Sequence, residues 1–233
     1  MNIREWLDHY FWIGVDRIFL IDNGSGDESV ALARGHPHSN RIDLIELPER
    51  YQQIAHYRNA MHVFNIRKRV DWLMVADLDE FWFFRHARKF KIVLRQYSVV
   101  DLVYTNWTMF GSGGFDRHSS SLRCDIVTKR PKIAAHAYSK WLVRTSAMNC
   151  DHQFDIHKVW DIDARRVISD NVELQLNHYP IQSREYFAKI KMTRGDAFKA
   201  ANDQVRDWAY FDRYDAPCVI PDTGLRDLLA RDP

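Results

Sequence analysis

Hydrophobic and polar positions along the first part of the chain predict helices and strands in turn. Residues 3–13 carry apolar side chains at helical spacing and are followed by Gly14, which predicts a helix that ends there. The run VDRIFLID (15–22) is short, β-branched and aromatic, as a buried strand is. Residues 25–34 begin with the S-x-x-E spacing of a capping box, which predicts a second helix.

The same alternation continues to residue 79. RIDLIEL (41–47) predicts a strand, residues 51–69 a long helix, and DWLMVADLD (71–79) a strand whose apolar middle is typical of the centre of a sheet. Strands that alternate with helices at this spacing favour right-handed crossovers. We therefore expect an α/β fold, Rossmann-like, with a mainly parallel sheet flanked by helices.

Beyond residue 80 the periodic signals are weaker. The predicted elements are a basic helix at 86–97, strands at 101–107, 139–148 and 172–179, and a long polar helix at 183–201. Between them, FGSGGFDRHSSS (110–121) is a glycine- and serine-rich loop of a length often used for binding. Because no repeat or long linker interrupts the chain, we expect residues 1–233 to form a single domain with a C-terminal helical segment.

Composition narrows the class of protein. The 233 residues are 46% hydrophobic, and 33 Lys and Arg against 31 Asp and Glu give a net charge of +2, which disfavours a nucleic-acid binder. Three cysteines without a CxxC pair favour a reducing compartment. No apolar run reaches the length of a transmembrane segment. We expect a cytoplasmic chain, and peripheral contact with a membrane stays open.

Asp77-Leu78-Asp79-Glu80 is the first candidate for chemistry. Carboxylates two residues apart at the end of a strand can converge on one divalent cation, and the carboxyl ends of strands are where open α/β sheets bind ligands. In a chain rich in Asp the spacing also arises by chance, and it recurs at Asp161-Ile162-Asp163. Only the first copy follows an apolar strand, so we assign the metal role to Asp77 and Asp79.

Asp22-Asn23-Gly24-Ser25-Gly26-Asp27 is the second candidate, at the end of the earlier strand. Glycines there let the backbone approach a ligand, and a carboxylate accepts hydrogen bonds from a nucleoside. Capping and a tight turn explain the neighbouring residues, which leaves Asp22 for nucleotide binding. Neither a GxGxxG nor a GxxxxGK[ST] phosphate loop occurs.

Five segments in order resemble the landmarks of the family 2-like glycosyltransferases related to family 92. They are REWLDHYFWIGVDRIFLIDNGSGDES, QIAHYRNAM, WLMVADLDEF, the FGSGG loop and HYPIQSREYFAKIKMTRG. The resemblance implies a GT-A fold, a nucleotide-diphosphate sugar donor, a glycan or other hydroxyl acceptor, and inversion at the anomeric carbon. It also implies a divalent metal, Mn²⁺ or Mg²⁺, held by the Asp-x-Asp motif.

Carried over residue by residue, the resemblance makes Asp77 and Asp79 the metal and donor motif and Asp22 the acid that reads the nucleoside. Gly111, Gly113 and Gly114 match the loop near the acceptor. It divides the chain into a nucleotide-binding half, about 1–80, and an acceptor half, about 81–233. The strand with which family members usually begin has no counterpart in this sequence.

Other side chains are candidates for supporting roles. His157 could complete a manganese site, because imidazole suits transition metals, and His178 is a weaker candidate. Lys189, Lys191 and Arg194 could cover the diphosphate as a lid, with Arg194 preferred.

Inversion by direct displacement needs a general base near the acceptor hydroxyl. Asp116, beside the glycine loop, and Asp125 are the candidates. Glu80 adjoins the metal motif, but in an extended segment its side chain points away from that of Asp79, so we assign it a structural role.

Two other functions use the same features. A metal-dependent nucleotidyltransferase would need the same carboxylate pair and α/β sheet, but it releases pyrophosphate instead of a nucleoside diphosphate. A non-catalytic nucleotide- or sugar-binding module would bind donors without turnover.

Overall fold

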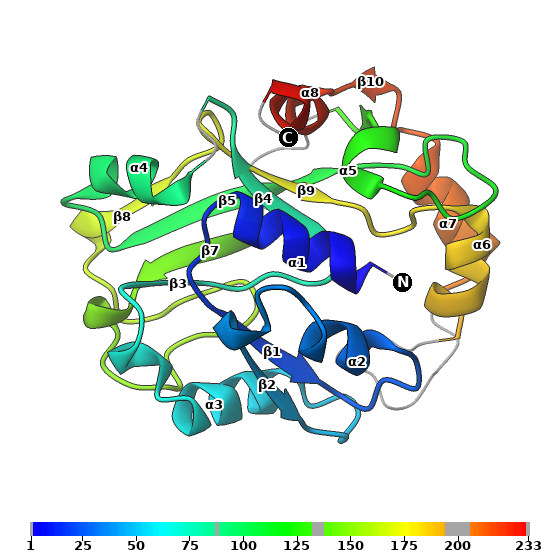
Figure 1. The fold of residues 1–233 in the computed structure, drawn as a ribbon. Helices are drawn as coiled ribbons and strands as arrows, with labels where there is room; N and C mark the ends of the chain where they lie inside the picture. The colour runs from blue at the N-terminus through cyan, green and yellow to red at the C-terminus, as the bar shows by residue number, and fades with distance from the viewer. Residues whose placement is uncertain (1, 87–88, 132–137, 194–205, 232–233) are drawn as a thin grey trace.

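The computed structural model describes residues 2–86, 89–131, 138–193 and 206–231 (Figure 1). The helices are α1 (Ile3–Trp12), α2 (Ser29–Arg34), α3 (Gln53–Val63), α4 (Phe90–Leu94), α5 (Leu122–Asp125), α6 (Arg184–Tyr186), α7 (Trp208–Asp215) and α8 (Gly224–Arg231). The strands are β1 (Ile18–Asp22), β2 (Ile42–Glu46), β3 (Trp72–Met74), β4 (Glu80–Phe84), β5 (Leu102–Met109), β6 (Thr128–Lys129), β7 (Ser139–Arg144), β8 (Val167–Ser169), β9 (Leu174–His178) and β10 (Ile220–Pro221).

The strands form a mixed sheet, so the expectation of a mainly parallel sheet is wrong. The order is β3-β7-β5-β9-β4, with β8 paired to β5. The pairs β3–β7, β7–β5 and β9–β4 are antiparallel, whereas β5 runs parallel to β8 and β9. β1 and β2 are parallel but form a separate pair. The α/β class is confirmed; helical crossovers are confined to the first part of the chain, and later strands enter the sheet without them.

Helix α1 anchors the centre of the molecule. Its buried face includes Trp6 and Tyr10, and it lies across β4 (Figure 1). The Trp6 indole N–H donates to the carbonyl of Asp77 at 2.9 Å, and the Tyr10 hydroxyl donates to that of Glu80 at 3.0 Å. Because Trp6 and Tyr10 each donate a side-chain hydrogen bond to a backbone carbonyl of this segment, α1 fixes the backbone around the Asp-x-Asp motif.

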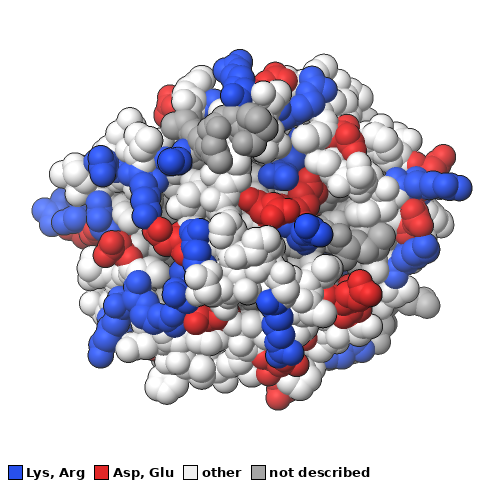
Figure 2. Space-filling model, viewed as in Figure 1, with Lys and Arg blue, Asp and Glu red and all other residues white. Residues whose placement is uncertain are grey.

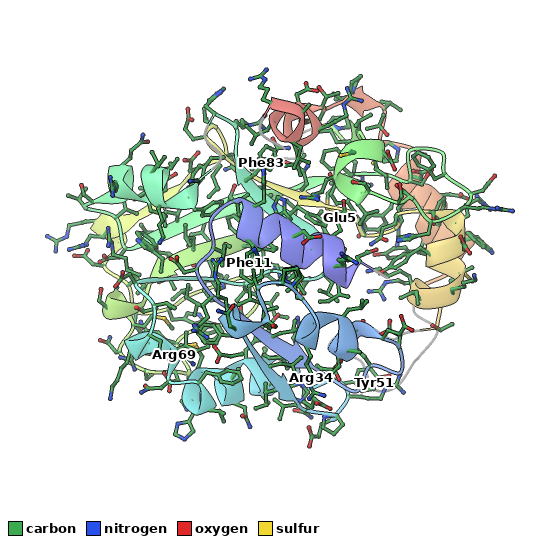
Figure 3. All side chains as sticks on the ribbon, in the orientation of Figure 1. Glu5, Phe11, Arg34, Tyr51, Arg69 and Phe83 are labelled. Atoms are coloured by element: carbon green, nitrogen blue, oxygen red, sulfur yellow. The ribbon has the colours of Figure 1, made fainter. Side chains whose placement is uncertain are left out.

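The strongest apolar element, β4, is absent from the sequence-based expectations. Its side chains Phe81, Trp82, Phe83 and Phe84 are all buried, because β4 pairs with β9 and is covered by α1. Phe83, labelled in Figure 3, extends toward α8, where its ring lies near Gly224. The aromatic run after the motif therefore builds the core that holds it.

Glu5 fastens α1 to the second half of the chain. Figure 3 shows it on the side of α1 that faces α5. Its carboxylate accepts from the Ser121 hydroxyl at 2.7 Å and the Leu122 amide at 3.1 Å, and it pairs with Arg123 at 3.1 Å. A carboxylate that satisfies free amides at a helix start is stabilising.

Element boundaries differ from expectation where local chemistry intervenes. The expected helix 51–69 ends at Val63, because Asn65 adopts a left-handed conformation with φ of 50°. Of the strand expected at 71–79, only Trp72–Met74 forms a strand, β3. The capping box is wrong: α2 starts after Glu28, and the Asp27 carboxylate accepts from the Ser29 amide at 3.0 Å.

The C-terminal segment departs most from expectation. In place of a long helix from 183, α6 is followed by a π-helical turn, Phe187–Lys191; residues 194–201 of the expected helix lie outside the described residues. Over the described ranges, none of the helices has the length and apolar character needed to cross a bilayer. The cysteines, Cys124, Cys150 and Cys218, are unpaired.

Candidate functional site

Asp77 lies in the segment between β3 and β4, and its carboxylate is held on both oxygens. Oδ2 accepts from the Lys140 ammonium at 2.9 Å, and Oδ1 accepts from the Gln53 amide at 3.1 Å and the Tyr57 hydroxyl at 3.5 Å. Gln53 and Tyr57 come from α3 and Lys140 from β7. Asp77 therefore faces the α3 side of the motif.

Glu80 shares the same lysine. Its Oε2 lies 3.4 Å from Lys140 Nζ and accepts from the Asp77 amide at 2.9 Å, while Oε1 accepts from the Trp107 indole N–H at 2.7 Å. Both Glu80 and Lys140 are fully buried. Burial raises the pKa of Glu80 to about 7, and the charge of Asp77 adds to that rise. These contacts hold the Asp77 backbone and the Trp107 ring in place, so Glu80 has a structural role.

Lys140 is the buried cation beneath the motif. Burial alone would lower the pKa of Lys140, but the carboxylates of Glu80 and Asp77 raise it above its ordinary value. A lysine that is buried between two acids stays charged, because losing its proton would leave those acids unpaired. Lys140 therefore stays protonated and neutralises the charge of the Asp77 carboxylate.

Asp79 faces the other way. Its Oδ2 accepts from the Lys191 ammonium at 2.6 Å, and its Oδ1 lies 3.6 Å from His178 Nε2. Burial alone would raise the pKa of Asp79, but Lys191 and His178 hold it well below the usual range. A carboxylate with this pKa is ionised at neutral pH. Asp79 thus forms a buried acid between a lysine from the π-helical turn and a histidine at the end of β9.

His178 carries the unusual polar atom of the site. Its Nδ1 is buried and has no hydrogen-bond partner among the described residues. Its ring packs on Trp107 with centroids 4.2 Å apart, and Trp107 is held by Glu80 through its indole N–H. A buried ring nitrogen without a partner is costly unless a ligand completes it. The geometry ranks His178 above His157 as the imidazole next to the motif.

His157 lies on the same tryptophan, Trp107, but has no contact with Asp79 like that of His178. It lies at 5.4 Å from Trp107 by ring centroids, and its Nδ1 is 2.9 Å from the Ser139 carbonyl oxygen. Within the described ranges, no group of three His, Cys, Asp or Glu side chains is close enough to hold a metal ion. The expected set of Asp77, Asp79 and His157 is therefore not brought together.

Asp22 lies at the end of β1, beside a cavity of about 120 Å³. Its carboxylate accepts from the Gly24 and Ser25 amides, both at 3.1 Å, so it shapes the turn that follows the strand. The cavity is also lined by Leu78, from the middle of the Asp-x-Asp motif, and by Tyr186 and Ile190 of the segment leading to Lys191. The two predicted acidic motifs therefore flank one cavity.

The glycine-rich loop is tied to that same segment. The Arg184 and Glu185 amides donate to the carbonyls of Phe115 and Asp116 at 3.1 and 2.9 Å. Gly113 and Gly114 turn the loop with positive φ angles of 64° and 78°. The loop is thus bonded to α6, and the π-helical turn that follows α6 provides Lys191, which bonds to Asp79.

Close packing explains Gly111. A side chain there would meet Asp215 and Cys218 at less than 3 Å, and the Asp215 carboxylate accepts from the Ser112 amide at 2.6 Å. The start of the loop is therefore fixed against α7, and the exposed residues 113–117 are the part that faces solvent.

The remaining predicted residues fall into three groups. Asp116 is exposed in the loop, and its backbone is held by α6. Asp125 ends α5, and its carboxylate accepts from the Ser119 hydroxyl. Arg194 lies outside the described residues, whereas Lys189 pairs with Glu185 on the surface.

Sequence reasoning missed Lys140 and undervalued Lys191 and His178. Lys140 could have been found as the charge directly before the apolar run Trp141–Val143 in SKWLVR, which becomes β7. Figure 2 shows acidic and basic side chains interspersed over the visible face. The site is therefore distinguished by its buried charges instead of a charged patch.

Comparisons with known proteins point to one family. A solved structure titled "Crystal structure of HddC from Yersinia pseudotuberculosis complexed with GMP-PN" aligns with 76% of this chain and 78% of that one, at 9% identity and a TM-score of 0.41, a likeness too loose to assign fold or ligand.

Two plant proteins are nearer in sequence. A glycosyltransferase family 92 protein of Oryza sativa subsp. japonica is 25% identical over 187 residues, which are 79% of this chain and 32% of the relative. One of Arabidopsis thaliana is 27% identical over 122 residues, 50% of this chain and 20% of the relative. The chain thus spans a third or less of these relatives. The family model for glycosyltransferase family 92 matches residues 1–211, and this chain belongs to that family.

Proposed function

We propose that this chain transfers a sugar from a nucleoside-diphosphate donor to a hydroxyl group of a glycan or similar acceptor, with inversion, in a GT-A arrangement. Membership of family 92 supports sugar transfer. The observation that carries the proposal is the Asp79–Lys191 pair, because the sequence neighbours of these two residues, Leu78 and Ile190, line the same cavity as Asp22. It supplies both an acid and a cation where the diphosphate of a donor would lie.

Asp22 and Lys191 bind the two ends of the donor in this proposal. Asp22 accepts hydrogen bonds from the nucleoside, since it is one of the residues that line the cavity. Lys191 turns from Asp79 toward the diphosphate, because a dianionic leaving group attracts an ammonium more strongly than one carboxylate does. Lys191 stays paired in both states, and the buried Asp79 carboxylate needs another cation in place of Lys191.

Asp79 and His178 fit a divalent cation better than the expected trio. Asp79 Oδ1 and His178 Nε2 lie 3.6 Å apart, and the other ring nitrogen, His178 Nδ1, has no hydrogen-bond partner among the described residues. A carboxylate with an imidazole is a donor set that suits Mn²⁺. When bound, the cation would neutralise the charge that develops on the departing diphosphate. Asp77 keeps Lys140 and positions the motif.

Direct displacement then proceeds from the loop side. The acceptor oxygen attacks the anomeric carbon while its proton passes to a carboxylate, and the bond from that carbon to the diphosphate oxygen breaks with its electron pair on the diphosphate. Asp116 is the preferred base, since it is exposed beside Gly113 and Gly114, whereas Asp125 is engaged by Ser119.

Product analysis tests the function. The chain is incubated with Mn²⁺ and a panel of nucleotide sugars, with mixed mono- and oligosaccharide acceptors, and the nucleotide products are separated by chromatography. Nucleoside diphosphate together with a glycosylated acceptor supports the proposal. Pyrophosphate would mean a nucleotidyltransferase, and donor binding without any product would mean a binding module.

A further inference from the structure

Arginines and tyrosines gather around α7, next to the candidate donor site. Helix α7 packs on the π-helical turn that carries Lys191, with the rings of Phe187 and Phe211 5.2 Å apart (Figure 1). Positions 210, 213 and 214 lie on one face of α7, because residues three and four apart are neighbours on a helix. We call the set the arginine–tyrosine patch; its members are Arg130, Tyr138, Arg206, Tyr210, Arg213 and Tyr214.

Strand β5 positions the part of the patch that does not belong to the α7 segment. The Trp107 amide donates to the Tyr138 carbonyl at 3.1 Å, and the Arg130 amide donates to the Met109 carbonyl at 2.9 Å. Both contacts lie on the edge of β5 that pairs with β7, two strand positions or about 7 Å apart. The Arg130 guanidinium lies over the Tyr214 ring at 5.0 Å, which joins this edge to α7.

Aromatic rings connect the patch to the candidate donor site. His178, 3.6 Å from Asp79, packs on Trp107 with centroids 4.2 Å apart, and Trp107 stacks on Tyr138 at 5.1 Å. Tyr138 is 57% exposed, so the side of its ring that is turned away from Trp107 is accessible to a ligand. A ligand that lies on Tyr138 therefore reaches toward Asp79 along a wall of rings.

Arg206 connects the patch to the same site from α7. Burial would lower the pKa of Lys191, Asp79 raises it above its ordinary value, and Arg206 is close enough to oppose that rise. The Arg206 guanidinium lies 5.8 Å from the centroid of Tyr210, which stacks on Tyr214 at 4.4 Å. The patch thus extends from the Asp79–Lys191 pair along the tyrosine-bearing face of α7.

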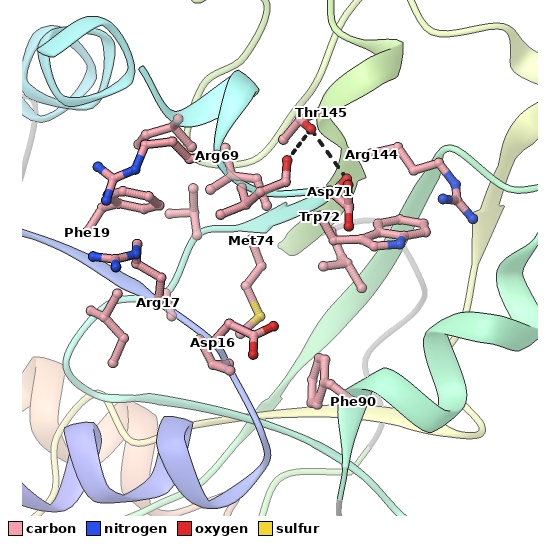
Figure 4. Close-up of a pocket in the computed structure, with 18 of the residues that line it drawn as sticks. Asp16, Arg17, Phe19, Arg69, Asp71, Trp72, Met74, Phe90, Arg144 and Thr145 are labelled. Atoms are coloured by element: carbon pink, nitrogen blue, oxygen red, sulfur yellow. Dashed lines mark hydrogen bonds between the residues drawn. The ribbon is translucent and has the colours of Figure 1, made fainter. Parts of the chain in front are cut away.

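The arginines of the patch have no carboxylate partner among the described residues. Arg130 and Arg213 lie over the Tyr214 ring at 5.0 and 6.0 Å, and Arg130 donates to the Arg213 carbonyl at 3.0 Å. By contrast, Arg69, which Figure 4 shows at the cavity between β1 and β3, pairs with Asp43 at 2.9 Å. The guanidinium groups of the patch therefore keep N–H donors for a ligand.

The acids of the α7 segment do not neutralise this face. Asp207 accepts from the Tyr210 amide at 2.8 Å, and Asp215 accepts from the Ser112 amide at 2.6 Å and the Ser112 hydroxyl at 2.9 Å. Asp212 is two positions from each tyrosine of the face, and helical geometry puts it on the opposite side of α7. The face that carries the tyrosines is therefore positive.

Exposed rings beside unpaired guanidinium groups specify the chemistry of a ligand. The apolar face of a sugar ring packs on an aromatic side chain, which supplies a flat apolar surface. A guanidinium binds a carboxylate through two parallel hydrogen bonds. A glycan that carries carboxylates satisfies both features, whereas a neutral glycan would leave the guanidinium groups without an anion.

We propose, on the basis of the proposed sugar transfer, that the arginine–tyrosine patch binds the acceptor and that this acceptor is an acidic glycan with carboxylate-bearing sugars. Its terminal sugar lies on Trp107 and Tyr138, so that its hydroxyl reaches the candidate donor site. The carboxylates of the following sugars pair with Arg130, Arg206 and Arg213. The loop that carries the preferred base, Asp116, is fixed to the same helix through Ser112.

Calorimetry with matched oligosaccharides tests the patch. The probes are linear trimers of galacturonic acid and of glucuronic acid, the neutral trimers made from them by carboxyl reduction, and citrate as a carboxylate without a sugar. Each is titrated with Mn²⁺ and UDP or GDP, and without them. We expect at least one acidic trimer to bind about tenfold more tightly than its neutral form, as a few partly exposed ion pairs would produce, and more tightly than citrate.

Variants locate the binding. Arg213→Gln removes one charge at an exposed position and should weaken binding of the acidic trimer about threefold without changing that of the neutral trimer. Tyr138→Ala removes a ring that both trimers use and should weaken both about fivefold. Arg165→Gln, at an exposed arginine outside the patch, should change neither. Circular dichroism checks that each variant is folded.

Transfer assays with the same trimers separate this inference from the proposed function. We expect sugar to be transferred faster to the acidic trimer than to its neutral form. Equal binding of acidic and neutral trimers, citrate binding as tight as that of the acidic trimers, or transfer to neutral trimers alone would overturn the acidic-glycan site. Charge-dependent binding that Arg213→Gln weakens, without transfer to any trimer, would support that site and count against the proposed function alone.

Discussion

The chain contains the Asp-x-Asp pattern twice, and the two copies differ in burial: Asp79 of the first copy is buried, whereas Asp163 of the second is exposed. In Asp77-Leu78-Asp79 each carboxylate holds a lysine from a distant part of the chain, Lys140 for Asp77 and Lys191 for Asp79. These ion pairs span 63 and 112 residues of sequence. The first copy is therefore built by the tertiary fold.

The second copy, Asp161-Ile162-Asp163, is satisfied by its own neighbours. The Asp163 carboxylate accepts from the backbone amide and the guanidinium of Arg165, both at 3.0 Å, and so caps a single turn of 3₁₀ helix. Asp161 adopts a positive φ of 58° in the preceding turn. Local turn chemistry accounts for this copy completely.

The two copies differ in whether their carboxylates can exchange a cationic partner for a ligand. Asp163 is bonded within its own turn and is exposed, so a ligand there would compete with water and with Arg165. Asp79 is buried, and burial would raise its pKa were it not for Lys191 and His178, which keep it low. A buried acid whose cation sits on a separate segment can change partners when a charged ligand arrives.

Removing the buried cation should have the largest effect. In Lys140→Met, two carboxylates lose their common partner, and we expect the free energy of unfolding to fall by about 3–5 kcal/mol, partly relieved by protonation of Glu80. Urea denaturation at pH 7 measures it. Lys158→Met, at an exposed lysine, is the control and should change stability by less than about 0.5 kcal/mol. Equal effects in the two variants would show that the Asp77 side of the motif is not a buried ion cluster.

Asp79→Asn should affect function most. The amide keeps the shape but removes the charge that pairs with Lys191, so we expect the rate of sugar transfer to fall by about 10²–10³-fold. Circular dichroism of the variant checks that the fold persists, and release of nucleoside diphosphate measures the rate. Activity near the wild-type level would remove Asp79 from the site.

The pH dependence of stability should report the buried ion pair of the first copy. The pKa of Asp79 is lowered in the folded protein, so its ion pair stabilises the fold above the ordinary value of 3.8 and is lost as the pH falls below it. The difference in unfolding free energy between wild type and Asp79→Asn should therefore be constant above about pH 5 and shrink as the pH falls below 3.8. Denaturation at several pH values reports it, and a difference that grows toward acid would contradict the assigned ion pair.

Asp163→Asn should have the smallest effect. Asparagine caps a helical turn about as well as aspartate, and an exposed ion pair contributes little. We expect a change in the free energy of unfolding of less than about 0.5 kcal/mol and an unchanged transfer rate. Thermal and urea denaturation measure the first, and a larger loss would mean that the second copy has a structural role beyond its turn.

Local patterns in the sequence predicted local structure well. The helix at the start, the strands that became β1 and β2, and the acid at the end of β1 follow from periodicity and turn residues within about ten positions. The family resemblance, drawn from motif order, is confirmed by the match over residues 1–211. The helix and strand signals depend only on neighbours in sequence, and the resemblance depends on the order of motifs along the chain.

Features set by distant pairing could not be predicted in the same way. The antiparallel insertion of β7 between β3 and β5 leaves no mark on hydrophobic periodicity, since a buried strand is apolar in either direction. The partners of the motif follow from that pairing: β7 delivers Lys140, and β9 delivers His178. His157 was preferred over His178 because sequence alone does not show which histidine the sheet brings to Asp79.

Titration calorimetry with a nucleoside diphosphate most directly tests the claim that the first Asp-x-Asp copy binds the donor and the second does not. UDP and GDP are titrated, with Mn²⁺ and with excess chelator, into wild type, Asp79→Asn and Asp163→Asn. We predict metal-dependent binding of at least one nucleotide to wild type and Asp163→Asn, and its loss in Asp79→Asn. Binding that survives in Asp79→Asn but is lost in Asp163→Asn would contradict the account.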